Sequence, residues 1–276
     1  MLKEARSLSP VGEGDARVPK SRNPTALTIV SLRNVGKAFS NGTRALTGLN
    51  LDVRDGELLS LLGPSGCGKS TALRIIAGLA APSEGTLEFG GARPEVGFVF
   101  QEPTLMPWTR VRDNVFLPLR LRGVSRTLAA PKIDEALALV GLTGFENAYP
   151  RELSGGMKMR VSIARALVLK PRLLLMDEPF AALDEITRFK LNNDLLRIKT
   201  ELGATVIFVT HSVYESVYLS TRIIVMAARP GRVIADIGVP APLPRDEDFR
   251  GAALYIDKCR EASAALHGAM GQGDHL

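Results

Sequence analysis

A chain of 276 residues with 45% hydrophobic and 23% charged side chains is long enough for one large globular domain or two small ones. No apolar run approaches the roughly 18 to 20 residues that cross a bilayer, and two cysteines, Cys67 and Cys259, do not make a disulfide framework. The net charge of +6 suits an anionic membrane surface or nucleic acid, but no nucleic-acid motif accompanies it. We therefore expect a soluble, cytoplasmic protein with no nucleic-acid partner.

Residues 1–26 are rich in charge, Ser, Pro and Gly, without an apolar stretch of signal-peptide length, which predicts a flexible tail. Residues 27–56 alternate apolar and polar side chains and contain Asn-Gly and Asp-Gly, which predicts antiparallel strands with tight turns. Short apolar runs of the buried, parallel-sheet kind then recur, separated by helical patterns such as EITRFKLNNDLLRIKTEL, so we predict an α/β fold. These runs are ELLSLLG, VGFVF, RLLLMD, TVIFVT and RIIVMA.

Residues 103–160 break this alternation, because they are Arg-rich, helical in pattern and without a strong strand. We expect them to form a helical insertion in an α/β domain that spans residues 27–240. The densest basic stretch, residues 110–126, has five arginines and one acid, which predicts either a solvated helix face or a surface facing a membrane or partner. Residues 241–276 begin with PAPLPRDED, and we expect a linker and a short helix there.

Residues 63–71, GPSGCGKST, match the phosphate-binding pattern G-x-x-x-x-G-K-[ST] directly after an apolar run. The glycines let successive N–H groups point at phosphates, and Lys69 adds a charge for the β- and γ-phosphates. Ser70 offers a hydroxyl ligand to Mg²⁺. Cys67 is either a filler or a nucleophile, and we favour the filler. The loop residues assigned to the nucleotide are Gly63, Pro64, Ser65, Gly66, Cys67, Gly68, Lys69, Ser70 and Thr71.

Polar residues follow three of the other apolar runs, at the ends where parallel sheets bind ligands. Asp177 would hold Mg²⁺, and Glu178 would polarise the attacking water as general base. Gln101 can reach Mg²⁺ and that water with its neutral amide. A lone histidine after a strand is usually structural, but beside these motifs we expect His211 to hydrogen-bond the γ-phosphate and hold the water in line with Glu178.

A second glycine turn, LSGG at residues 153–156, opens another helical pattern. Ser154 occupies an N-cap position, and Gly155 and Gly156 expose N–H groups at the positive end of the helix, which makes an anion site. The loop at residues 63–71 already surrounds one face of a triphosphate. The residues alone leave open whether both loops serve one chain.

In this order the motifs resemble those of the ATP-binding subunits of ABC transporters, over about residues 28–240. The resemblance also includes Phe39 before the phosphate loop and Asp184 in the ALD triplet. It implies a P-loop NTPase cassette with a RecA-like parallel sheet core, an antiparallel β subdomain and an inserted helical subdomain, which hydrolyses ATP with Mg²⁺. It also implies that Phe39 stacks on adenine, that Asp184 joins the nucleotide site, and that LSGG of one copy caps the γ-phosphate held by a second copy.

The segments LMPWTRVRDNVFLPL, MDEPFAALDEITR and VMAARPGRV resemble the nitrate, sulfonate and taurine importer branch of this family. That branch implies membrane permease subunits as partners, a solute-binding protein acting indirectly, and a peripheral location on the cytoplasmic face of the cell membrane. The solute stays open among nitrate, taurine, aliphatic sulfonates, cyanate and thiamine-precursor pyrimidines. Met157 departs from the family's usual glutamine, so it is left out of the site.

Two other functions compete with a transport ATPase. A soluble ABC ATPase acting on DNA or ribosomes typically has two cassettes or a long coiled coil, whereas this chain has one cassette and no heptad run. A kinase or GTPase built on the same phosphate loop has no use for LSGG. We therefore predict the energising ATPase of an importer.

Overall fold

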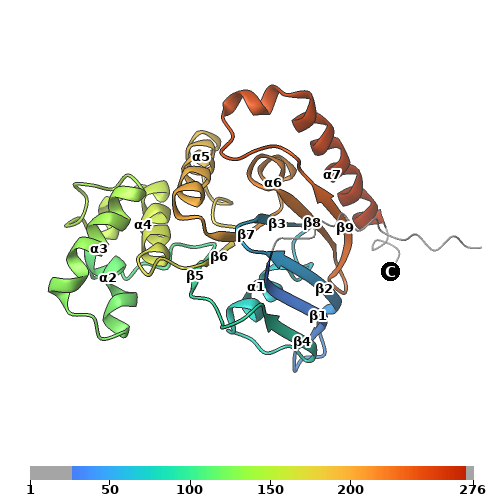
Figure 1. Ribbon diagram of the computed structural model, residues 1–276, viewed down its shortest axis with the longest axis horizontal. Coiled ribbons are helices and arrows are strands. Elements are labelled where there is room, and N and C mark those ends of the chain that lie inside the picture. Colours follow the sequence, from blue (N-terminus) through green and yellow to red (C-terminus); the bar gives the residue numbers. More distant parts are fainter. Residues whose placement is uncertain (1–26, 272–276) are drawn as a thin grey trace, which may run out of the picture.

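The computed structural model describes residues 27–271, and the flexible tail predicted for residues 1–26 lies outside the described residues. Figure 1 shows a central sheet with helices α5, α6 and α7 on one side and a smaller sheet with helix α1 on the other. Among the described residues, no helix is long and apolar enough to cross a membrane. The α/β class predicted from the apolar runs is confirmed.

The central sheet has six strands, of which the first five in sheet order are parallel and the last is antiparallel. Every residue of the three innermost predicted strands, β3, β6 and β7, is buried, as their continuous apolar runs predict. In sheet order the strands are β5 (Val96–Val99), β6 (Leu173–Asp177), β7 (Thr205–Thr210), β3 (Leu58–Leu62), β8 (Arg222–Ala227) and β9 (Arg232–Gly238).

The smaller sheet is antiparallel and has the order β2-β1-β4. Its long hairpin of β1 (Thr28–Ala38) and β2 (Arg44–Arg54) is the one predicted from the alternating pattern. The edge strand β4 (Glu84–Phe89) and the strand β9 of the central sheet were not predicted. Most of their residues are exposed or half-buried, so neither has the continuous apolar run or strict alternation that signals a strand.

Two cores lie on opposite faces of the central sheet, because alternate residues of a strand point to opposite sides. In β3, Leu59 and Leu61 pack with α1 (Lys69–Ala77) and the smaller sheet, whereas Leu58 and Leu62 pack with the helices of the other face. Those helices are α5 (Glu185–Leu202), α6 (Val213–Leu219) and α7 (Ala253–Gly271). The parallel strands β3, β6 and β7 are therefore covered on both faces.

Three α-helices lie between β5 and β6 and gather at one end of the molecule (Figure 1). They are α2 (Val111–Leu121), α3 (Arg126–Leu139) and α4 (Gly155–Leu167), with the 3₁₀ helix η1 (Pro150–Glu152) before α4. This is the helical insertion expected within residues 103–160, and α4 continues beyond it. Met159 of α4 is 2% exposed and belongs to the core that joins these helices to the central sheet, which explains an apolar residue there.

The C-terminal segment adds a 3₁₀ helix, η2 (Glu247–Gly251), and the helix α7. With 19 residues, α7 is longer than the short helix expected from the sequence. It packs on α6, β8 and β9, and its side chains Tyr255, Cys259 and Ala262 are part of the core. Both Cys67 and Cys259 are buried free thiols.

Candidate active site

The loop between β3 and α1 is so closely packed that two of its positions have no room for a side chain larger than that of glycine. A Cβ on Gly63 would lie 2.6 Å from the Met226 carbonyl oxygen, and one on Gly68 would lie 2.7 Å from the Ala45 carbonyl oxygen. Gly68 also has φ 88°, in the left-handed region that favours glycine. The residue pattern therefore produces a close-packed curl that ends at the start of α1, a favourable position for phosphate.

The side chain of Lys69 lies inside this curl and is 3% exposed. Its Nζ donates to the carbonyl oxygens of Gly63 at 2.8 Å and Pro64 at 3.0 Å, and it lies 3.4 Å from Glu178 Oε1. Burial raises the pKa of the neighbouring Cys67 thiol, so the neutral thiol is favoured, as in the filler role. The ammonium group of Lys69 is thus held between the phosphate loop and the end of β6.

Ser70 and Asp177 form the next contact of the site. Ser70 Oγ donates to Asp177 Oδ1 at 2.7 Å, and Asp177 is 6% exposed at the end of β6. Burial raises the pKa of the Asp177 carboxyl, although the hydrogen bond from Ser70 acts in the opposite direction. A hydroxyl beside a carboxylate is an oxygen donor set that fits Mg²⁺, which takes one or two protein ligands plus phosphate oxygens and water. The described residues contain no group of three or more acidic, His or Cys side chains that could hold a metal without such phosphate oxygens.

Glu178 lies between Lys69 and His211. Its Oε2 is 3.3 Å from His211 Nδ1, and its N–H donates to the Val209 carbonyl at 3.1 Å. The backbone of Glu178 has φ 47°, a left-handed conformation that costs a non-glycine residue roughly 1 to 3 kcal/mol. Such strain is concentrated at functional sites, where the surrounding structure holds a side chain in a direction it would otherwise avoid.

Two further predicted residues lie at the edges of this cluster. Gln101 is exposed and follows β5, whose Val99 pairs with Met176 of the parallel strand β6, so Gln101 and Asp177 leave neighbouring strands at the same end. Phe39 is 46% exposed in the turn of the β1–β2 hairpin. The start of β2 reaches the phosphate loop, because Leu46 Cδ2 would lie 2.6 Å from a Cβ on Gly68.

The LSGG turn lies at the start of α4 and not in the loop between β3 and α1. Ser154 is the N-cap of α4 and accepts a hydrogen bond from the Met157 N–H at 3.3 Å. A Cβ on Gly156 would lie 2.6 Å from Thr187 Cγ2 at the start of α5. Asp184 is the N-cap of α5 and accepts from the Thr187 N–H at 2.9 Å. Within one chain, LSGG therefore packs beside the ALD turn and the first turn of α5.

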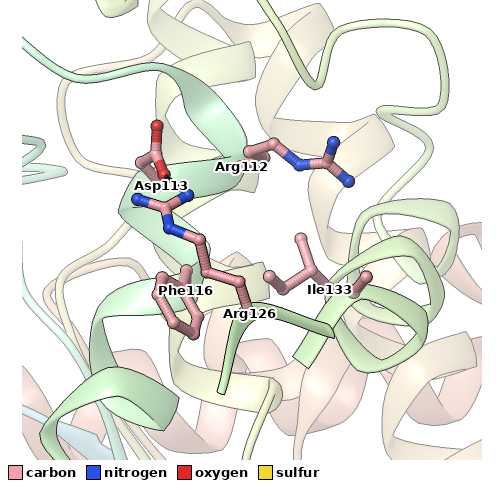
Figure 2. Close-up of a pocket in the computed structure, with 6 residues that line it drawn as sticks. Arg112, Asp113, Phe116, Arg126 and Ile133 are labelled. Atoms are coloured by element: carbon pink, nitrogen blue, oxygen red, sulfur yellow. Dashed lines mark hydrogen bonds and ion pairs between the residues drawn. The ribbon is translucent and has the colours of Figure 1, made fainter. Parts of the chain in front are cut away.

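Three of the five arginines in residues 110–126 form ion pairs, two of them with acids from other segments. The helical insertion contains a cavity of about 170 Å³, which Figure 2 shows with its lining residues. There Arg126 Nη1 lies 2.7 Å from Asp113 Oδ1, and the guanidinium of Arg126 lies over the ring of Phe116. Arg112 pairs with Asp134, and Arg122 pairs with Glu95. Acids distant in sequence thus neutralise two of these arginines, and both interpretations of the stretch, a solvated helix face or a surface facing a membrane or partner, stay open.

The chain is similar to known proteins along most of its length. A family model described as ABC transporter matches residues 46–181. A Brucella abortus protein named as an ATP-binding protein is 50% identical over 226 residues, which are 80% of this chain and 86% of that protein. An aliphatic sulfonates import ATP-binding protein of Pseudomonas syringae is 47% identical over 234 residues, 85% of this chain and 96% of that protein. The dimeric cassette MJ0796, solved in a post-hydrolysis state with ADP and Pi, has a TM-score of 0.68 and 34% identity and covers 78% of this chain and 100% of its own.

A phosphate loop between a parallel strand and a helix, beside acidic strand ends, defines a P-loop NTPase. The chain belongs to the ATP-binding subunits of ABC transporters, because relatives at 47% and 50% identity span most of its length. It is therefore an ATPase that serves transport, as the motifs predicted. The sulfonate-import relatives also confirm the resemblance to the nitrate, sulfonate and taurine importer branch.

Some residues around the site were not predicted from the sequence. Thr210 and Glu215 are buried and hydrogen-bonded to each other, and the half-buried Arg188 lies 3.9 Å from Glu215. The pattern Ser-x-x-Glu at residues 212–215 was a usable signal, because it is typical of a helix N-terminus. Arg188 had no such signal, since its contact with Glu215 joins two helices.

Proposed function

We propose that two copies of this chain share two ATP molecules, each held by the phosphate loop of one copy and capped by LSGG of the other. The observation that carries this proposal is the placement of Gly156 against Thr187, at the start of α5, whereas the phosphate loop lies between β3 and α1. LSGG packs on the first turn of α5 and is not part of the loop between β3 and α1, so we expect a second chain to bring the phosphate that LSGG caps. The dimeric state of the MJ0796 cassette supports the same arrangement.

In each site, Lys69 neutralises the β- and γ-phosphates, and the glycine-rich loop supplies N–H donors around them. Glu178 accepts the proton of the attacking water, since it lies at the end of β6 between Lys69 and His211. His211 holds the water and Glu178 in line with the γ-phosphate. Phe39 stacks on adenine, and Asp184 completes the nucleotide site beside LSGG.

Ser70 and Asp177 would hold Mg²⁺, with Gln101 as a third oxygen ligand from the neighbouring strand. Bound there, the ion would neutralise charge on the phosphate oxygens. The chain's own part is to orient these oxygens. Asp177 is fixed by its hydrogen bond to Ser70, whereas Gln101 is exposed and can move with the helical insertion that follows it.

The partner on the other side of the helical insertion is a membrane permease, which keeps the pair on the cytoplasmic face of the membrane. Trp108 is 75% exposed between Gln101 and α2, where a partner's movement would be felt at the Mg²⁺ ligands. A groove of about 330 Å³ is lined mainly by apolar side chains of β5, α2 and α4, among them Leu121, which is 79% exposed. Both features suit a protein partner better than a charged lipid surface.

The transported solute that fits best is an aliphatic sulfonate, supplied to the permease by a solute-binding protein. This rests on the names of relatives from Bacillus and Pseudomonas, which are import proteins for aliphatic sulfonates. Uptake of an alkanesulfonate by vesicles containing the chain and the permease encoded beside it tests the assignment. Competition by nitrate or taurine that exceeds competition by the alkanesulfonate would assign a different solute.

The shared sites are tested by mixing two inactive variants. Ser154→Arg blocks the cap and leaves the phosphate loop intact, whereas Lys69→Ala disables the loop and leaves the cap. A mixed pair has one intact site, so the mixture should hydrolyse ATP faster than either variant alone. Affinity tags on the two variants show whether mixed pairs have formed. If they have, and the mixture still hydrolyses ATP only at the background rate of each variant, independent shared sites are contradicted.

A further inference from the structure

Glu215 is a buried carboxylate that the proposed hydrolysis mechanism does not use. It lies in the first turn of α6 and is 8% exposed, and burial raises the pKa of its carboxyl. Its Oε2 accepts a hydrogen bond from Thr210 Oγ1 at 2.7 Å, and its Oε1 lies 3.9 Å from Nε of Arg188 on α5. His211 and Arg250 are the other charged or titratable groups whose charge acts on it. A carboxylate removed from water in this way is costly unless its partners compensate.

Helix capping does not explain this side chain. Ser212 and Glu215 have the spacing of a capping box, in which the glutamate would accept a hydrogen bond from the Ser212 N–H. Only the first half of the box is present, since Ser212 Oγ accepts from the Glu215 N–H at 3.3 Å. The Ser212 N–H donates to Thr210 Oγ1 at 3.0 Å instead. The carboxylate is therefore turned away from its own helix end, toward Thr210 and Arg188.

Arg188 continues the contact into the ALD turn. Its Nη2 donates to the Leu183 carbonyl oxygen at 2.8 Å, directly before Asp184. Within residues 27–271, neither Arg188 Nε nor Glu215 Oε1 has a hydrogen-bond partner. The two atoms lie 3.9 Å apart, so each has the opposite charge of the other as its compensation. One line of contacts thus runs from the ALD turn through Arg188 and Glu215 to Thr210, the residue before His211.

We propose that Glu215 and Arg188 are a positioning pair, which fixes the ALD turn relative to the end of β7 that carries His211. Neither residue is assigned to the nucleotide site, and each acts through the residue it holds, Thr210 or Leu183. The inference rests on the roles proposed above for His211 and Glu178. Hydrolysis should be sensitive to this pair, because a displacement of about 1 Å at a reacting group can reduce turnover roughly 100-fold.

The first test replaces Glu215 with glutamine, which keeps the shape of the side chain and an acceptor for Thr210 but removes the charge facing Arg188. We expect kcat to fall roughly 10- to 100-fold while the affinity for ATP stays at the wild-type value. Glu57→Gln is the matched control. Glu57 is also buried, has a pKa raised by burial and lies 3.6 Å from an arginine, Arg222, but it precedes β3 at the end opposite the phosphate loop. Its kcat should be unchanged.

The second test distinguishes positioning from a loss of folding stability. Thr210→Val removes the hydroxyl that joins Glu215 to β7, and Thr210→Ser restores it, so kcat should fall in the first and recover in the second. Arg188→Gln combined with Glu215→Gln should lose about as much as the worse single variant, because the two residues act as a unit. The two Thr210 variants decide the question even if Glu215→Gln folds poorly.

The inference is wrong if Glu215→Gln turns over like wild type, if Thr210→Val and Thr210→Ser are equally active, or if the losses of the double variant multiply. Glu178→Gln is measured alongside. Full turnover in Glu178→Gln would overturn the proposed hydrolysis mechanism itself. A slow Glu178→Gln beside a wild-type Glu215→Gln would overturn the positioning pair alone.

Discussion

Ser70 Oγ donates a hydrogen bond of 2.7 Å to Asp177 Oδ1 across 107 residues of sequence. The bond joins the first turn of α1, which follows the phosphate loop, to the end of β6, whose last residue is the buried Asp177. The start of α1 and the end of β6, both assigned to the proposed ATP site, are thereby held at a fixed separation. The predictions below follow from this site and from the surfaces around it.

Replacing Lys69 with alanine should abolish hydrolysis and weaken ATP binding about 10- to 100-fold, because it removes the charged donor held inside the phosphate loop. Titration with a fluorescent ATP analogue, together with phosphate release, measures both effects. Lys170→Ala removes an exposed lysine paired with Glu135 and should behave like wild type. Wild-type turnover in Lys69→Ala would show that residues 63–71 are not the phosphate loop of the site.

Replacing Glu178 with glutamine should keep ATP binding and slow hydrolysis about 10²- to 10⁴-fold, since the amide cannot accept the proton of the attacking water. The variant should accumulate as an ATP-bound pair, which size-exclusion chromatography with ATP detects. Glu201→Gln, an exposed change on α5, is the control and should hydrolyse ATP normally. A Glu178→Gln rate equal to that of wild type would exclude Glu178 as the base.

The sequence predicted the strands whose residues are all buried, because a continuous apolar run is a local signal. It could not predict β4, whose exposed edge becomes a strand only through pairing with β1, which precedes it by about fifty residues. The order of the strands in the sheet is likewise a result of tertiary packing. The polar residues that follow parallel strands could be predicted from the sequence to lie near one another, because parallel strands end at one edge of the sheet.

Other parts of the site depend on contacts between distant segments. Arg188 has no local pattern that distinguishes it from any other helix arginine, and its role depends on Glu215 of another helix. The arginines of residues 110–126 likewise find acids such as Asp134 and Glu95 only in the folded chain. The expectation that a second copy takes part came from the resemblance to a family, because neither glycine turn implies it by itself.

Replacing Trp108 with alanine should impair assembly with the permease and solute uptake while leaving ATP binding by the isolated chain unchanged. The ring is 75% exposed in the isolated chain, so its removal leaves the core intact. Pull-down of the permease and nucleotide titration measure the two effects separately. Tyr214→Ala, an exposed aromatic residue on α6, is the control for general surface effects. Reduced ATP affinity in Trp108→Ala would count against a coupling role.

Replacing Arg245 with methionine should lower the free energy of unfolding by roughly 2 to 4 kcal/mol. Arg245 is 7% exposed, and its guanidinium donates to the carbonyls of Val217 and Tyr218 at the end of α6 and to those of Val239 and Ala241. Burial lowers its pKa to about 10, so the group keeps its charge at neutral pH. Methionine leaves these carbonyls without their donor.

Thermal unfolding measures the loss, and Arg260→Met supplies the control. Arg260 lies on α7 with a side chain that is 78% exposed, so its replacement should leave the midpoint unchanged. An equal effect of the two substitutions would mean that Arg245 does not attach the C-terminal segment to α6.

The dependence of ATPase rate on protein concentration tests the shared sites most directly. If LSGG of one copy completes the site of another, the rate should rise as roughly the square of concentration while single chains dominate, and become linear once pairing is complete. Sedimentation under the same conditions reports the fraction of pairs. A rate strictly proportional to concentration, in a sample that stays monomeric during turnover, would mean that both loops serve one chain and that the proposed ATP site is wrong.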